Sequence, residues 1–320
     1  MGRELGLEAA AAAMRSAQRI GVAGHVGPDG DALGSMLAIA HAARAAGKEA
    51  WASFGEPFVL PALFDFLDTT PLVSPRDLPD DLDLFVVVDT GVPERLGSLL
   101  PKARSARRVL VIDHHPITGD FGDVALVDPL AAATTQLVFS LIEALQWKVD
   151  KTVAVALYTG LVTDTGRFQY SSTSPATHRI AAALLAAGVE PDLIGRRLYE
   201  EAPFAYYTVI SRVMGRAVLD AEHRLVWSVL TQDDLDAAGI AYEETDSLID
   251  LVRIAEESAV CCLLKEMESG VIKGSLRSRG EVDVAAIAAE LGGGGHHNAA
   301  GFTFHGTAED AIEAVRALLS

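Results

Sequence analysis

Short apolar runs and longer segments of mixed character follow one another through the first half of the chain. Runs of four or five mostly β-branched residues predict buried parallel strands, and apolar residues recurring every three or four positions predict amphipathic helices. The expected strands are 19–23, 49–54, 85–88, 109–112 and 124–127, and the expected helices are 5–15, 31–46, 62–67, 133–146 and 152–163. This alternation predicts an α/β domain whose mostly parallel, doubly wound sheet is covered by helices on both faces.

The pattern changes after about residue 187. Helical character continues through 176–187, 191–200 and a stretch that ends near 216, and shorter elements follow. The later expected elements are strands at 225–230, 259–267, 271–277 and 302–305, and a closing helix at 307–319 with Thr307 as its N-cap. We therefore expect a first domain over 1–187, a helical connector over 188–218 and a smaller α/β domain over 219–320.

Three expected strands of the first domain lead into acidic and histidine side chains. Ligands of open α/β sheets sit outside the carboxyl ends of the strands, so these side chains should meet at one place. A further acid, Asp164, follows the helix expected at 152–163. The strand-end side chains are His25, Asp29 and Asp31 after the first strand, Asp89 after the third, and Asp113, His114 and His115 at the end of the fourth.

This residue set predicts a metal centre. Converging carboxylates repel one another unless cations lie among them, and histidine with carboxylate but no thiolate favours Mn²⁺ or Mg²⁺ over structural zinc. The candidate ligands are too many for one ion that must also bind water and substrate, so two ions about 3.5–4 Å apart that share a carboxylate are expected. Asp29 and Asp31, two residues apart in a presumed extended loop, should face the same way.

Each of these side chains also has an ordinary structural explanation. Asp31 would suit a turn and the N-cap of the following helix, and Asp89 could begin a polar turn. His114 or His115 alone would more often be packed or on the surface, and Asp164 could be a loop residue. Their placement at four separate points, each at the expected edge of the sheet, favours the site.

Composition restricts the function further. Half of the residues are hydrophobic, which excludes a disordered chain, and no apolar run reaches the length of about 18 residues that a membrane span needs. The net charge of −18 argues against a surface for long nucleic acid, but a few local arginines and bound cations could hold a short anionic substrate. We expect no signal peptide, two buried thiols at Cys261 and Cys262, and hence a cytoplasmic location. The alanine-rich helices are compatible with a homodimer.

The second domain carries candidate phosphate-binding residues. Arg277 and Ser278 end an expected strand, and the arginine can donate two hydrogen bonds to one phosphate. A glycine run that no core should require, containing Gly293, Gly294 and Gly295, would let backbone amides approach a phosphate, with His296 as a further donor. Arg167 lies three residues beyond Asp164. The alternatives are a flexible linker for the glycines and surface charges for both arginines.

These residues resemble a known family. His25…Asp29-x-Asp31, Asp89, Asp113-His114-His115 and Asp164 resemble the four motifs of the DHH phosphoesterase superfamily, and residues 293–301 resemble the Gly-Gly-Gly-His-x-x-Ala-Ala-Gly signature of the DHH-associated C-terminal domain. The resemblance covers nearly the whole chain. The length is similar to that of the bacterial nanoRNase / pAp-phosphatase group, which degrades oligoribonucleotides of a few residues and dephosphorylates 3′-phosphoadenosine 5′-phosphate (pAp). Some relatives cleave cyclic di-AMP or pApA.

The resemblance implies a role for each residue. His25, Asp29 and Asp89 would hold one Mn²⁺, and Asp31, Asp89, His114 and Asp164 would hold the other, with Asp89 shared. Asp113 would orient the histidines, and His115 would face the phosphate and stabilise or protonate the leaving oxygen. The first domain would be catalytic and the second would bind substrate. The implied activity is that of a Mn²⁺-dependent phosphodiesterase or phosphatase on short RNA or nucleotide phosphates.

Two other functions stay open. An inorganic pyrophosphatase or exopolyphosphatase would use the same metal site, although it would need more lysines and arginines than lie near the motifs. A nucleotide-binding sensor without activity is disfavoured because every ligand position is filled. An exonuclease of the RecJ type on long DNA is disfavoured by the overall charge.

Overall fold

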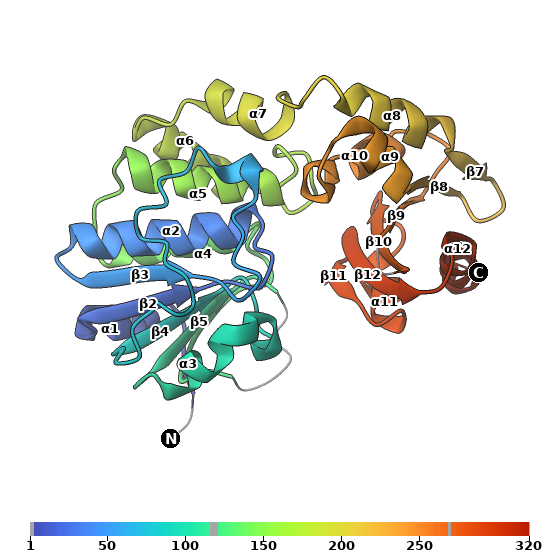
Figure 1. Ribbon diagram of the computed structural model, residues 1–320. Coiled ribbons are helices and arrows are strands. Elements are labelled where there is room, and N and C mark those ends of the chain that lie inside the picture. Colours follow the sequence, from blue (N-terminus) through green and yellow to red (C-terminus); the bar gives the residue numbers. More distant parts are fainter. Residues whose placement is uncertain (1–2, 116–120, 268–269, 320) are drawn as a thin grey trace. The chain divides into compact units, whose positions relative to one another are not determined.

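The computed structural model describes residues 3–115, 121–267 and 270–319. The chain divides into two compact units, Met1–Leu198 and Tyr199–Ser320 (Figure 1). The boundary falls inside the expected connector, so that α7 (Pro191–Tyr199) belongs almost wholly to the first unit and α8 (Tyr206–Gly215) to the second. The division into a catalytic domain, a connector and a substrate-binding domain stays a prediction.

The first unit is built on a parallel sheet, which confirms the expected fold class. Its strands lie in the order β1-β6-β5-β4-β2-β3, and each neighbouring pair is parallel. They are β1 (Glu4–Leu5), β2 (Arg19–Ala23), β3 (Glu49–Ser53), β4 (Leu84–Val88), β5 (Val109–Asp113) and β6 (Val124–Val127). The short edge strand β1 was not expected, because two residues are too few to show a period and the helix was predicted to start there.

The strand order places a topological switch point between β2 and β4. The chain leaves β2 for β3 on one side and then crosses to β4 on the other side. Ala23 pairs with Val87, and Val88 pairs with Ile112, so β2, β4 and β5 end at the same edge of the sheet. Ligands of doubly wound sheets bind at such a point.

Helices cover one face of this sheet, and two of them pack closely through glycine. This layer contains α1 (Leu7–Ser16), α2 (Gly30–Ala45), α4 (Thr134–Ala144), α5 (Lys151–Asp164) and α6 (Pro175–Ala186), whereas α3 (Leu100–Ser105) lies on the opposite face. A Cβ on Gly34 of α2 would lie 2.4 Å from the carbonyl oxygen of Ala156 in α5, and a Cβ on Gly160 would lie 2.8 Å from Oδ1 of Asp31. The missing side chains therefore let α5 run directly beside α2.

The opposite face is covered by a segment that the sequence pattern did not reveal. The 3₁₀ turns of η2 (Pro93–Leu99) and the short helix α3 bury Leu96, Leu99 and Ala103 against Phe85 and Val111 of the sheet. Two short, kinked pieces do not produce the apolar period of a regular helix. The short helix expected over 62–67 forms only one 3₁₀ turn, η1 (Ala62–Phe64).

The second unit contains a mixed sheet with a core on each face. Its strand order is β11-β12-β10-β9-β8-β7, in which β8 and β9 are parallel and the other pairs are antiparallel. Cys261 packs in one core and Cys262 in the other, so both are buried thiols as predicted. The strands are β7 (Val218–Asp220), β8 (Leu225–Leu230), β9 (Val260–Glu266), β10 (Val271–Ser278), β11 (Gly294–His296) and β12 (Ala299–His305), and the helices are α9 (Gln232–Ala238), α10 (Leu248–Val252), α11 (Val284–Glu290) and α12 (Ala308–Leu319), with one 3₁₀ turn, η3 (Tyr242–Thr245).

The glycine run has a packing function that the sequence analysis missed. It forms the edge strand β11, which pairs with β12. A Cβ on Gly293 would lie 2.1 Å from the carbonyl oxygen of Gly301, and a Cβ on Gly295 would lie 2.5 Å from that of Ala299. The expectation that no core requires these glycines is therefore wrong for both, because only glycine allows the two strands to approach this closely.

None of the helices within 3–115, 121–267 and 270–319 combines the length and the apolar character that crossing a bilayer requires.

Candidate metal centre and phosphate-binding residues

The loop after β2 supplies the first group of potential ligands. The His25 side chain is buried, and its Nε2 lies 3.9 Å from Oδ2 of Asp29 and 3.6 Å from Oδ2 of Asp89. The other oxygen of Asp29, Oδ1, accepts hydrogen bonds from the amides of Asp31 and Ala32 and so caps α2. The sequence suggested Asp31 as the N-cap of α2, but in the structure the N-cap is Asp29. Its other oxygen, Oδ2, faces His25.

A second group gathers around His114, which follows β5. Its Nε2 lies 3.3 Å from Oδ2 of Asp164 at the end of α5, 3.7 Å from Oδ1 of Asp89 and 4.0 Å from Oδ2 of Asp31. Asp31 lies in the first turn of α2 rather than in an extended loop. It therefore does not face the same way as Asp29, and the expectation from their spacing was wrong.

Asp31 is held by the start of another helix. The amide of Thr134 donates to its Oδ2 at 2.6 Å, and the amide of Thr135 donates to its Oδ1 at 2.9 Å. Both donors belong to the first turn of α4, where amides lack partners within the helix and the helix dipole favours a negative charge. The carboxylate is thus fixed in a buried position before any ion arrives.

Asp89 lies between the two groups. Its Oδ2 faces His25 and its Oδ1 faces His114, so one carboxylate reaches both sides. The residue follows β4 with φ of 58°, a left-handed conformation that costs a non-glycine residue roughly 1–3 kcal/mol. The hydroxyl of Thr134 donates to Oδ1 at 2.9 Å, and the Asp89 amide donates to the carbonyl of Ile112. The surrounding contacts hold the strained residue in place.

The protein alone leaves this cluster electrostatically unfavourable. Burial, followed by the nearby carboxylates of Asp31 and Asp29, raises the pKa of Asp89 and of Asp164 well above its ordinary value. Burial also raises the pKa of Asp31, and it lowers the pKa of His25 so that this imidazole is neutral at pH 7. Neutral imidazoles with carboxylates that need a counter-charge are the donor set for a hard or intermediate cation.

The two consecutive histidines are oriented by different partners. Nδ1 of His114 lies 3.2 Å from the carbonyl oxygen of Ala131, which turns Nε2 toward the carboxylates. Nδ1 of His115 lies 2.7 Å from Oδ1 of the fully buried Asp113, which also accepts the amide of His115 at 3.0 Å. The expected orienting role of Asp113 is supported for His115 by these two contacts, and for His114 it stays a prediction.

The geometry of the cluster fits divalent cations. One ligand atom from each residue lies within 4.8 Å of the others in three sets: His25 with Asp29 and Asp89, Asp31 with His114 and Asp164, and Asp89 with His114 and His115. Ions bound at about 2.0–2.2 Å hold neighbouring ligand atoms roughly 3–4 Å apart, which is the range of the separations given above. The candidate ligands expected from the sequence therefore all lie in one cluster.

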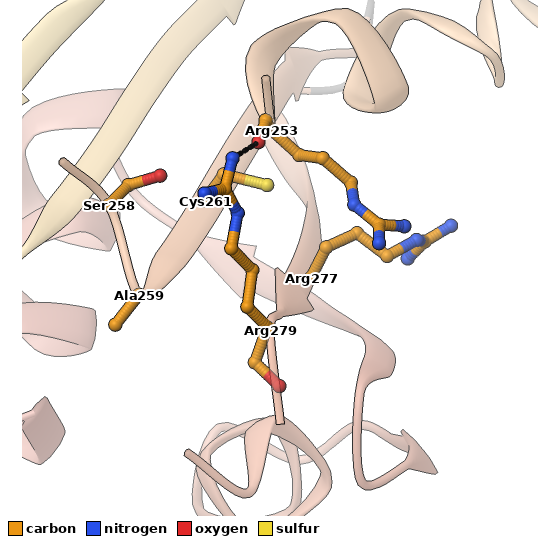
Figure 2. A pocket seen from close by; sticks show the side chains of 7 residues that line it. Arg253, Ser258, Ala259, Cys261, Arg277 and Arg279 are labelled. Atoms are coloured by element: carbon orange, nitrogen blue, oxygen red, sulfur yellow. Dashed lines mark hydrogen bonds between the residues drawn. The ribbon is translucent and has the colours of Figure 1, made fainter. Parts of the chain in front are cut away.

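The candidate phosphate-binding residues lie elsewhere. Arg277, at the end of β10, lines a small hollow (Figure 2) together with Ser278. The Ser278 hydroxyl donates to Oδ1 of Asn298. Gly294 belongs to β11 and has open space at its Cα, while the side chain of His296 lies outside the described part of the structure. Arg167 is exposed in the turn after α5, with φ of 63°. A phosphate-binding role for these residues stays a prediction.

Three residues near the candidate sites were missed by the sequence analysis. Thr134 begins a helix and gives no chemical signal of its own. Arg95 is exposed, and its carbonyl accepts the amide of Val26 beside His25. Its charge helps to lower the pKa of His25. Arg253 follows α10 and lines the same hollow as Arg277. None follows a strand, which is the pattern that revealed the others.

The sequence matches two family descriptions. The DHH family, N-terminal domain, matches residues 19–161, and the DHHA1 domain matches residues 228–320. The chain belongs to the DHH family. As the resemblance implied, it is a DHH phosphoesterase with a DHHA1 domain, and the DHH match spans most of the candidate ligands, up to the last residues of α5.

Individual relatives agree with this assignment. The DHH-family chain is 37% identical over 303 residues to the bifunctional oligoribonuclease and PAP phosphatase NrnA of Thermus thermophilus, and the match covers 92% of this chain and 88% of NrnA. An exopolyphosphatase-related protein from Bacteroides fragilis superposes with a TM-score of 0.90 at 26% identity, covering 98% and 95% of the two chains. RecJ from Thermus thermophilus, solved with Mn²⁺, has a TM-score of 0.53 at 17% identity, covering 98% of this chain and 54% of RecJ, and shows a common fold alone.

Proposed function

We propose that this DHH phosphoesterase hydrolyses short oligoribonucleotides to mononucleotides and pAp to AMP, with two Mn²⁺ as cofactors and Mg²⁺ as an alternative. The observation that carries the proposal is the position of Asp89, whose two oxygens face one ligand group each. A shared carboxylate between two ligand groups is the arrangement of two-metal phosphoesterases. The similarity to NrnA supports the choice of short RNA and pAp as substrates.

The proposal assigns six residues to the ions. His25 and Asp29 would hold one, Asp31, His114 and Asp164 would hold the other, and Asp89 would contact both. The chemistry that such a pair supplies when bound is a lowered pKa of water and neutralisation of phosphate charge. All of these side chains except the exposed Asp29 are buried or half-buried, and the set requires little rearrangement to receive the ions.

His115 would act on the substrate rather than on a metal. The contact with Asp113 fixes the ring through Nδ1, and Nε2 would face the reacting phosphate. In that orientation His115 can stabilise or protonate the leaving oxygen, while Asp113 offsets the charge of the protonated ring. Arg277, Ser278, Arg167, His296 and the amides of Gly293–Gly295 would hold the remainder of the substrate, with Arg277 carrying most of the charge.

Hydrolysis of inorganic phosphate chains is a second candidate. The Bacteroides fragilis structure with the TM-score of 0.90 is described as exopolyphosphatase-related. The metal cluster would serve pyrophosphate or polyphosphate as well as a phosphodiester, since both reactions transfer a phosphoryl group to water. The substrate-binding residues would then decide between them.

Initial rates on a panel of substrates test the proposal. With Mn²⁺ added, we expect the purified chain to hydrolyse RNA dinucleotides and pAp at least tenfold faster than pyrophosphate or polyphosphate; pApA and cyclic di-AMP complete the panel. The control is Asp192→Ala, an exposed acid of α7, which should match the wild type. Faster hydrolysis of pyrophosphate than of every nucleotide would replace the proposal with the second candidate. A homodimer and a cytoplasmic location stay predictions.

A further inference from the structure

An arginine lies beside the acidic cluster on the segment that follows Asp89. The chain forms η2 within a few residues of Asp89, and Arg95 lies inside η2. The carbonyl oxygen of Arg95 accepts the amide of Val26 at 2.8 Å, and Val26 directly follows His25. This hydrogen bond joins η2 to the loop that carries the first ligand group.

The backbone of η2 is fixed around Arg95. The side chain of Leu96 is fully buried against the sheet. Gly97 has φ of 54°, and a Cβ there would lie 2.7 Å from Cγ2 of Val26. A Cβ on Gly55, in the loop after β3, would lie 2.5 Å from the carbonyl oxygen of Leu96. Because three segments pack this closely, the starting point of the Arg95 side chain is fixed, although the residue itself is exposed.

The charge of Arg95 acts on the first ligand group. Burial is the main cause of the lowered pKa of His25, and the charge of Arg95 contributes in the same direction. Partial burial opposes the ionisation of Asp29, but His25, backbone amides and Arg95 act the other way and lower its pKa. Within residues 3–115, 121–267 and 270–319, no hydrogen bond or ion pair engages the Arg95 guanidinium, so its five N–H donors can serve a ligand.

The charge balance of the proposed metal centre favours a further cation. Two divalent ions would offset the four carboxylates assigned to them, and histidines bind metals as neutral imidazoles. The fully buried Asp113 adds another carboxylate. A substrate phosphate therefore enters a centre without surplus positive charge, and an arginine within reach of that phosphate would stabilise it.

We propose that the Arg95 guanidinium binds a non-bridging oxygen of the reacting phosphate from the side of His25 and Asp29, so that η2 contributes a catalytic residue. A guanidinium can donate two parallel hydrogen bonds to one phosphate, and it stabilises the charge that the phosphate oxygens carry in the transition state. This inference rests on the proposed function, because it assumes that a phosphate ester reacts at the cluster.

Arg95→Ala separates this role from support of the metal. The variant should lower kcat/KM for an RNA dinucleotide roughly 10–100-fold, the effect of losing a hydrogen bond to a charged group, and the loss should appear mainly in kcat because the contact is with the reacting phosphate. The affinity of the metal-free chain for Mn²⁺ should not fall, because a cation beside the ligands is removed. Steady-state kinetics and calorimetric titration with Mn²⁺ give the two values.

Two matched variants separate the guanidinium from the segment that carries it. Arg95→Lys keeps the charge but loses the paired donors, and it should recover part of the lost rate. Arg104→Ala removes an exposed arginine of α3, on the same face of the sheet, and should change neither the rate nor the affinity for Mn²⁺. Wild-type kinetics of Arg95→Ala, or a fall in its affinity for Mn²⁺ that accounts for the lost rate, would overturn the proposal while leaving the phosphoesterase function intact.

Binding of inorganic phosphate distinguishes failure of this inference from failure of the proposed function. If the wild type hydrolyses no nucleotide, the proposed function fails, and calorimetric titration of the Mn²⁺-loaded full chain with inorganic phosphate still decides about Arg95. The wild type and Arg104→Ala should bind phosphate roughly tenfold more tightly than Arg95→Ala. Equal affinities of the wild type and Arg95→Ala, or no binding by either, would contradict the role of Arg95.

Discussion

In the first unit, carboxylates and histidines crowd a buried edge of a parallel sheet, and in the second unit, arginines surround a small hollow at the end of a mixed sheet. The acidic cluster is pre-oriented by backbone amides, by helix starts and by the strained backbone of Asp89. The arginines lie on longer side chains, and Arg279 donates a hydrogen bond to the carbonyl oxygen of Arg253. Mostly buried carboxylates suit small hard cations, whereas partly exposed arginines suit a phosphate that enters and leaves.

The comparison also explains how a chain of net charge −18 can handle phosphate substrates. The overall charge repels long polyanions, but the two regions act over a few ångströms, where local charge dominates because salt screens longer distances. Two bound divalent cations would offset the four carboxylate charges of the proposed ligands and could themselves contact phosphate oxygens. Both regions would then attract phosphate.

The largest expected effect comes from removing the shared carboxylate. Asp89→Ala should lower the rate of hydrolysis by more than about 10³-fold, because both ligand groups lose a member. The fold should survive, since the change removes repulsion as well as a hydrogen bond. Rates and circular dichroism measure the two effects, with Asp192→Ala as the matched control. If Asp89→Ala kept Mn²⁺-dependent turnover near the wild-type level, the assignment of the acidic cluster as the metal centre would be contradicted.

The next effect separates the residues that hold ions from those that act on the substrate. Asp113→Asn should reduce kcat by roughly 100-fold, the usual scale of acid–base assistance, because His115 loses its anionic partner. The affinity for Mn²⁺ should change little, since Asp113 contacts His115 rather than a proposed ligand. Calorimetric titration with Mn²⁺ and steady-state kinetics give the two values. A large loss of Mn²⁺ affinity with kcat retained would mean that His115 is a ligand.

A smaller effect tests the pre-orientation of the acidic cluster. Thr134→Val keeps the shape of the side chain but removes the donor to Asp89. We expect the affinity for Mn²⁺ to fall roughly tenfold, in line with a lost hydrogen bond to a charged group. Thr159→Val is the control, because the buried Thr159 hydroxyl donates to the carbonyl of Val155 within α5 rather than to a carboxylate. Equal losses in both variants would count against a specific role of the Thr134 hydroxyl.

The smallest effect concerns stability without metal. A carboxyl whose pKa is raised by folding binds more protons in the folded than in the unfolded chain, so stability falls as the pH rises between the two pKa values. Asp89→Asn removes this penalty. The metal-free variant should therefore melt a few degrees above the wild type at pH 7, where about 1 kcal/mol corresponds to 2–4 °C.

The pH series provides the control for that effect. The gap in Tm should close as the pH falls toward the ordinary aspartate pKa of about 3.9. His25, whose lowered pKa gives a slope of the opposite sign, is present in both proteins, so its contribution largely cancels. Scanning calorimetry in a chelator gives the series. A lower Tm of the variant at pH 7 would show that the hydrogen bonds of Asp89 outweigh its repulsion.

The acidic cluster could be predicted from the sequence because most of its residues follow buried strands. Asp89 comes directly after Leu84–Val88, and His114 directly after Val109–Asp113, so the parallel sheet itself dictates that they meet. The pattern could not reveal that Asp29 rather than Asp31 caps α2, because both residues suit the position and only the packing of α4 against Asp31 decides.

Only part of the arginine hollow could be predicted, because the sequence pattern identifies residues at strand ends. Arg277 ends a strand and was identified, but Arg253 follows a five-residue helix whose position depends on tertiary packing. The packing role of Gly293 and Gly295 was hidden as well, because a run of glycines indicates a close approach without naming the partner strand. Local sequence reveals strand ends, whereas contacts between distant elements require the fold.

Anomalous diffraction at the manganese absorption edge, from crystals grown with Mn²⁺, tests the central claim most directly. The account predicts two peaks about 3.5–4 Å apart, one beside His25 and Asp29 and the other beside Asp31, His114 and Asp164, with Asp89 between them. A cluster that stays without any peak, or peaks that lie only at other acidic residues, would contradict it.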